Sequence, residues 1–253
     1  ASSRPLLSAP RAIPSTPAMS RLLPQWSLLL LLLFCCCCVQ SSVGIPQPLG
    51  TTGFPVPHAA FLSIFPPDPS QQDALLVSSF SALHTGSVYV LDDIAQLAAN
   101  NFSHAAPKEV VGGFLWPNEI GPVPTNAIPD FYGMYVPDGF LVPLHSTGAV
   151  YLVPLPQGGT KIKITADKTG YFYHRVVWHD MNGDGRLDAL TARGHLPLLL
   201  RGQPTSSKGV GELLWLEQPQ SGALSGQPWK EHVLAQGPDF FFAVVSQEGG
   251  KLV

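Results

Sequence analysis

Nine consecutive residues carry side-chain oxygens at alternating positions, a spacing that suits the chemistry of a hard metal cation. The segment 180–188 has aspartate or asparagine at positions 1, 3, 5 and 9 and a glycine, Gly185, at position 6. Such a loop wraps oxygen ligands around Ca²⁺, and the glycine permits the sharp turn in its middle. The predicted ligands are the side chains of Asp180, Asn182, Asp184 and Asp188 and the main-chain carbonyl of Arg186.

Three other interpretations of this loop compete with a structural calcium site between two strands. An EF-hand needs a bidentate Glu at position 12, where this chain has Thr191, and the flanking residues are typical of strands rather than helices. Asn-Gly and Asp-Gly also form tight turns without an ion, but a hairpin needs only one such pair, and uncompensated aspartates repel one another. Magnesium prefers a near-octahedral site with several waters. A structural calcium ion is therefore the preferred interpretation, and an ion-free turn is the main alternative.

Catalytic signatures are few. The chain lacks Gly-x-Ser-x-Gly, His-Glu-x-x-His, phosphate-loop and dinucleotide-binding glycine patterns. His174 and His179 lie five residues apart on an expected strand, which places them on opposite faces. No catalytic or organic-cofactor residue is predicted, and the question of enzymatic activity stays open.

Composition indicates many short strands joined by turns. The 253 residues include 24 Gly and 26 Pro, about twice the usual share of proline, and proline interrupts helices. The net charge is −3 and no cluster of Lys and Arg occurs, which argues against a nucleic-acid partner.

The amino-terminal part has the pattern of a secretory signal. We expect residues 1–18 to be flanking sequence, residues 19–44 to be the signal peptide, and residues 45–253 to form the mature domain. The apolar block 26–39 has 14 residues, fewer than the roughly 20 that span a bilayer. Secretion is thus expected, with a retained membrane anchor at 26–39 as the alternative.

Cysteine and sequon positions agree with that assignment. All four cysteines, at 35–38, lie in the apolar block, so the mature chain would contain none. A secreted domain without disulfides depends on its core or on bound ions. Asn101 begins the Asn-Phe-Ser sequon and is the predicted glycosylation site.

Three segments repeat one pattern, a glycine followed by a β-rich run. They are 86–91, 148–153 and 211–216, spaced 62 and 63 residues apart. An aspartate-led apolar run precedes each, at 73–77, 138–142 and 188–192, with a fourth candidate at 239–244. Repeats with several strands per unit favour a β-propeller, so the expected fold class is all-β.

Local patterns predict the neighbouring elements. Segments 171–178 and 187–191 are expected strands joined by the aspartate loop, and 161–164 alternates as a strand with one solvated face does. Residues 92–100 are the one helix-like stretch, and the proline-rich segment 116–137 is expected to be a long loop.

The aspartate loop, following an aromatic strand and leading into Leu-Asp-Ala-Leu, resembles FG-GAP/VCBS-type repeats. That resemblance is specific over about 171–195. It implies a calcium-loaded β-propeller like those of integrin α-subunit heads, with the five residues named above as ligands. Three to four blades would be present, so we expect the propeller to continue beyond this sequence.

Two functions follow as expectations. The first is a secreted, calcium-stabilised binding or adhesion module with an unknown protein or carbohydrate ligand. The second is a propeller-type carbohydrate-active enzyme, a lyase or oxidoreductase, with active-site residues partly outside this sequence. A cluster of His and acidic side chains near the propeller axis would favour the enzyme.

Overall fold

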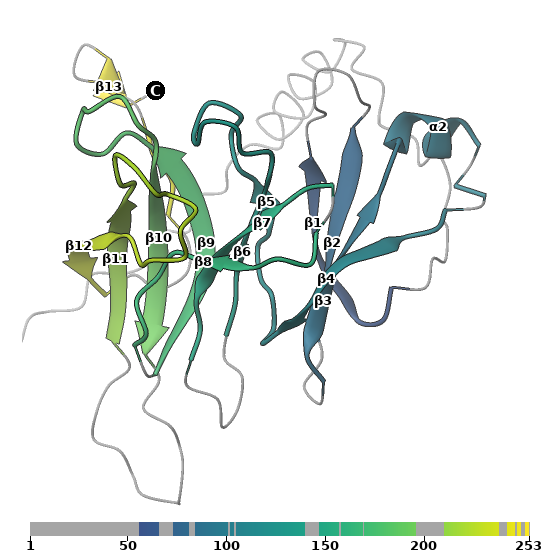
Figure 1. Cartoon of the computed structure of the whole chain (residues 1–253), viewed down its shortest axis with the longest axis horizontal. Coiled ribbons are helices and arrows are strands. Elements are labelled where there is room, and N and C mark those ends of the chain that lie inside the picture. The colour runs from purple at the N-terminus through teal and green to yellow at the C-terminus, as the bar shows by residue number, and fades with distance from the viewer. Residues whose placement is uncertain are drawn as a thin grey trace, which may run out of the picture. The chain divides into compact units, whose positions relative to one another are not determined.

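A computed structural model describes most of the chain between residues 56 and 252, and the protein there is built almost entirely of antiparallel strands (Figure 1). The described ranges are 56–65, 73–80, 84–100, 102–103, 105–139, 147–156, 158–168, 170–195, 210–237, 242–245, 247–248 and 251–252. The predicted signal, the four cysteines and Asn101 lie outside them. The all-β prediction is confirmed.

The first sheet is a four-stranded meander with strand order β1-β2-β3-β4. Its strands are β1 (Ala59–Phe65), β2 (Ala74–Ser79), β3 (Gly86–Leu91) and β4 (Lys108–Phe114). A six-residue helix, α2 (Ile94–Ala99), lies in the connection between β3 and β4, within the stretch predicted to be helical. Asp93 caps it by accepting a hydrogen bond from the Gln96 amide at 2.9 Å.

The second sheet has the same sequential order, β5-β6-β7-β8. Its strands are β5 (Gly121–Pro122), β6 (Gly133–Pro137), β7 (Val150–Pro154) and β8 (Ile162–Lys163). Two of them fall in the segment 116–137, so the prediction of a strand-free loop there was wrong. The reason is tertiary packing. All five residues of β6 are buried, and a strand that is covered on both faces does not show the alternation of apolar and polar residues that identifies a strand in the sequence.

The third sheet has the order β12-β11-β10-β9 and the longest strands. It consists of β9 (Tyr171–His179), β10 (Asp188–His195), β11 (Val210–Glu217) and β12 (Lys230–Gln236). A short pair, β13 (Gln247–Glu248) and β14 (Lys251–Leu252), follows.

The three repeated glycine-led segments correspond to equivalent strands. They match β3, β7 and β11, each the third strand of its sheet. Of the aspartate-led runs, those at 73 and 188 match β2 and β10, both second strands. The run at 138 was placed too late, since β6 ends at Pro137, and residues 140–142 lie outside the described part. The run at 239 is not confirmed, because its described residues, 242–244, have no strand.

Side chains of the second sheet pack in both directions. Met134 and Val136 of β6 belong to a core cluster shared with Leu76 and Phe114 of the first sheet. Between them in sequence, Tyr135 belongs to a separate cluster shared with strands of the third sheet. The period-two alternation of β6 therefore supplies both interfaces.

Backbone contacts also connect the sheets. Thr147 forms a parallel bridge with Tyr171 of β9, and the Tyr173 amide donates to the Asp138 carbonyl at 3.2 Å. The Trp229 amide donates to the Ile164 carbonyl at 2.8 Å. Main-chain groups at the ends of the second sheet are thus paired with the third.

Candidate functional site

The aspartate loop connects two adjacent strands of the third sheet, as predicted. His179 at the end of β9 pairs with Asp188 at the start of β10, so the loop closes a hairpin. Gly183 and Gly185 have φ values of 77° and 84°, a left-handed conformation that glycine adopts without a steric penalty. The two glycines turn the loop so that its alternate side chains share one region.

Asp180 organises the first half of the loop. Its Oδ1 accepts hydrogen bonds from the amides of Gly183 and Asp184 at 2.7 and 3.2 Å, and its Oδ2 accepts one from Gly185 at 2.9 Å. These donors, the Gly185 amide first among them, lower the pKa of Asp180 below its usual value. The carboxylate is therefore held in its anionic form.

Asp188 forms the buried side of the site. Its side chain is fully buried and accepts hydrogen bonds from the Gln218 amide at 2.8 Å and the Met181 amide at 3.0 Å. Burial raises the pKa of Asp188, and the nearby charges of Asp184 and Asp180 raise it further. A cation close to these three carboxylates would reverse that effect.

Arg186 already places one positive charge beside the loop. Its guanidinium forms an ion pair with Asp184, and its Nε donates to the Gln218 carbonyl at 3.3 Å. Gln218 in turn donates through Nε2 to the Ala127 carbonyl at 2.9 Å. Gln218 was not predicted from the sequence, and its position after β11 carries no local signal for this role.

The oxygen atoms of the loop retain capacity for a metal ion. A carboxylate or amide oxygen has two lone pairs, and the Asn182 Oδ1, Asp184 Oδ1 and Asp180 Oδ2 atoms each accept one hydrogen bond within the loop. This all-oxygen donor set fits Ca²⁺ in chemistry. In the described part of the chain, no group of three or more His, Cys, Asp or Glu side chains is arranged to hold a metal by itself.

A second polar cluster lies where the first strands of the sheets approach one another. Glu119, just before β5, forms an ion pair with Arg175 of β9 at 3.1 Å. His174 of β9 is buried, lies 3.8 Å from Glu119, and contacts Phe61 of β1 edge-to-face. Burial raises the pKa of Glu119 and Arg175 lowers it, with a net increase. His179, at the end of the same strand, is exposed.

A third cluster, unanticipated from the sequence, is the buried arginine of β10. The Arg193 side chain is 2% exposed and pairs with Glu212 of β11 at 2.7 Å and Glu231 of β12 at 3.0 Å. Its guanidinium also lies over the Tyr171 ring, 4.4 Å from the centroid. These contacts join all four strands of the third sheet, and because every donor faces a partner within one sheet we assign the cluster to stability.

Comparison with known proteins gives no match to a family model, a curated protein or a solved structure. No helix in the described ranges has the length and hydrophobicity that crossing a membrane requires.

Proposed function

We propose that this chain is a secreted β-propeller of the FG-GAP/VCBS type, stabilised by calcium, which serves as a binding or adhesion module. The observation that carries the proposal is the position of the aspartate loop between the first two strands of a four-stranded antiparallel sheet. The three successive meanders with the same strand order support it, since propeller blades are four-stranded sheets of this kind.

The proposed calcium role is structural. Asp180, Asn182, Asp184 and Asp188, with the Arg186 carbonyl, would hold the ion, which would offset the repulsion among three carboxylates. Asp188 links that site to the core through its bond to Gln218, so the ion would fix the β9–β10 hairpin against β11. For a module with a Kd of roughly 10⁻³ M, a tenfold excess of calcium adds about 1.4 kcal/mol to the free energy of unfolding.

Thermal unfolding with calcium and with a chelator tests this role. We expect calcium to raise the Tm of the native chain by about 3–5 °C, magnesium to raise it less, and Asp184→Ala to abolish the calcium effect. Asp167→Ala is the matched control, because Asp167 is exposed, outside the loop and paired only with Lys163 among the described residues. Equal Tm values with calcium and chelator in the native chain would refute the calcium proposal.

The second candidate function is a propeller-type carbohydrate-active enzyme, and the cluster of Glu119 with His174 is the observation that favours it. A carboxyl group with a raised pKa beside a histidine is suited to proton transfer. Glu119 also forms an ion pair with Arg175, which explains its position equally well as a structural contact. The enzyme is therefore the second candidate. Glu119→Gln should abolish turnover of an acidic polysaccharide while leaving the Tm within a few degrees. Absence of turnover in the native chain would remove the enzyme proposal.

A further inference from the structure

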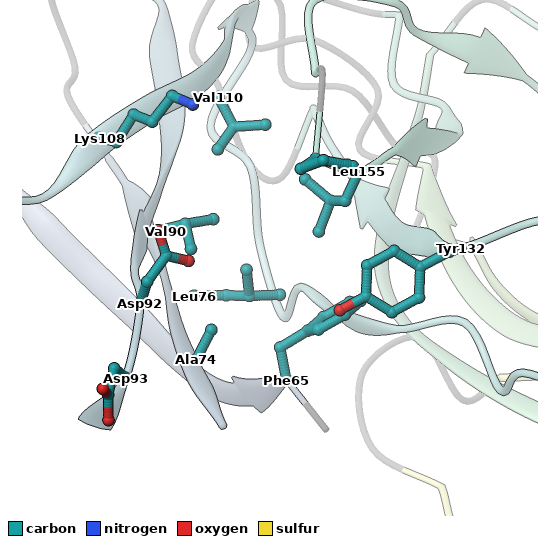
Figure 2. A pocket seen from close by; sticks show the side chains of 11 residues that line it. Phe65, Ala74, Leu76, Val90, Asp92, Asp93, Lys108, Val110, Tyr132 and Leu155 are labelled. Carbon is teal, nitrogen blue, oxygen red and sulfur yellow. The ribbon is translucent and has the colours of Figure 1, made fainter. Parts of the chain in front are cut away.

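A cavity of about 250 Å³ lies against one face of the first sheet, away from the aspartate loop (Figure 2). One wall comes from alternate residues of β2 and β3, including Ala74, Leu76 and Val90. Tyr132 and Leu155, which flank strands of the second sheet, form the opposite wall. The cavity is therefore built by the same packing that joins the two sheets.

The interior of this cavity is apolar. Its free apolar surface comes from Ala74, Val110, Tyr132 and Leu155, which are half-buried, and Leu76 lies buried behind them. The Phe65 and Tyr132 rings, both in the lining, pack edge-to-face with their centroids 5.1 Å apart. A dry apolar cavity of about 150 Å³ takes up benzene, so this larger one has room for an aromatic or branched aliphatic side chain.

The mouth of the cavity carries one acid and one base that are free to act on a ligand. Asp92 and Lys108 are both exposed, and neither forms an ion pair or side-chain hydrogen bond with another described residue. Lys108 begins β4 and Asp92 directly follows β3, and Lys108 pairs with Val90, two residues before Asp92. Asp93 also lines the mouth, but its carboxylate already caps α2.

We propose that this cavity binds a free α-amino acid with an apolar side chain. The side chain occupies the interior between Ala74, Tyr132 and Leu155, the α-ammonium group faces Asp92, and the α-carboxylate faces Lys108. The charge pattern decides the class, since a hydrocarbon would leave both charges unused and a fatty acid or an amine would use only one of them. The site is independent of calcium and of the proposed adhesion role.

Titration calorimetry with four probes separates the parts of this recognition. L-Phenylalanine carries both charges and the ring, glycine lacks the side chain, phenethylamine lacks the carboxylate, and 3-phenylpropionate lacks the ammonium group. We expect phenylalanine to bind most tightly and each other probe to bind about tenfold more weakly or not at all, as expected when a charge-assisted hydrogen bond or the apolar contact is lost.

Two exposed-site variants connect each charge to its residue. Asp92→Asn should weaken phenylalanine about tenfold and leave 3-phenylpropionate unchanged, whereas Lys108→Gln should weaken phenylalanine and leave phenethylamine unchanged. Asp73→Asn is the matched control, an exposed acid near β2 that does not line the cavity, and should bind phenylalanine normally. Because all three positions are exposed, each variant should retain the native Tm.

Three results would overturn the proposal. They are failure of the native chain to bind phenylalanine, equal affinity for phenylalanine and the singly charged probes, and binding of an apolar peptide without binding of the free amino acid. A chain that lacks the calcium response but binds phenylalanine would refute the calcium proposal alone, and the reverse pattern would refute only the amino-acid site.

Discussion

Asp138 should make the stability of this protein depend on pH between about 4 and 6. Its carboxylate is 4% exposed and accepts hydrogen bonds from the Ala149 amide at 2.8 Å and the Leu115 amide at 3.3 Å. Burial raises the pKa of Asp138 from 3.8 to about 6, against the opposing effect of those amides. The folded state therefore binds a proton at this group at a pH where the unfolded chain has released it.

The sign and size of the effect follow from linkage. Between the unfolded value of 3.8 and the folded value of about 6, the folded state holds more protons, so the free energy of unfolding falls as the pH rises. The difference of about 2.2 pKa units corresponds to about 3 kcal/mol. This contribution is complete below pH 3.8 and is lost once the pH passes about 6.

Urea unfolding of the native chain and of Asp138→Asn, measured from pH 4.5 to 7.5, tests the prediction. Other groups with raised pKa values, including Glu119 and Asp188, titrate in both proteins and cancel in the difference. We expect the free energy of unfolding of the native chain, minus that of the variant, to decrease by about 2 kcal/mol across this range, as the raised pKa requires. Parallel profiles for the two proteins would show that Asp138 titrates normally and refute the reasoning.

Four further predictions concern the core and the loop. Arg193→Met should destabilise the protein by about 3–5 kcal/mol in urea unfolding, because Glu212 would remain buried without a cation and Glu231 would keep only its ion pair with Lys168, whereas Arg193→Lys should cost less. Gly133→Ala should prevent stable folding by circular dichroism, since a Cβ atom there would lie 2.3 Å from the Val153 carbonyl oxygen. By contrast Gly183→Ala meets no neighbouring atom and should cost only about 1 kcal/mol, from its left-handed backbone. Arg186→Gln keeps the carbonyl ligand but removes a competing positive charge, so calorimetry should find calcium binding about three- to tenfold tighter.

Local sequence patterns were sufficient where a strand is long and has its own hydrophobic or aromatic run. The aromatic segment before the aspartate loop forms β9, and the glycine-led run after the loop forms β11. These strands are nine and eight residues long, so their hydrophobic pattern is visible in the sequence. The loop between β9 and β10 was predictable for a different reason: its glycines and acids encode the turn locally.

Strands that depend on neighbouring sheets were not predictable in this way. Gly133–Pro137 is short and ends in proline, and its strand conformation follows from burial on both sides. The partners of Arg193 lie 19 and 38 residues away, and a register shift between β9 and β10 precedes it. No single-sequence pattern specifies which side chains such a shift brings together, so the buried ion cluster and the role of Gln218 emerged only from the structure.

Two buried aspartates explain how strand ends are fixed in a part of the chain that contains no cysteine. Asp138 follows β6 and binds amides of Leu115 and Ala149, at the end of β4 and before β7. Asp188 begins β10 and binds amides on either side of it, at Met181 and Gln218. Each carboxylate thus connects segments that a disulfide would otherwise join, at the cost of a buried charge.

Asp138 lowers that cost by taking up a proton, as its raised pKa indicates. Asp188 lies beside Asp180 and Asp184, whose charges oppose its ionisation, and the proposed calcium ion would lower the cost there without a proton. Calcium should therefore distinguish the two aspartates, since it would stabilise the charge of Asp188 and leave Asp138 unaffected.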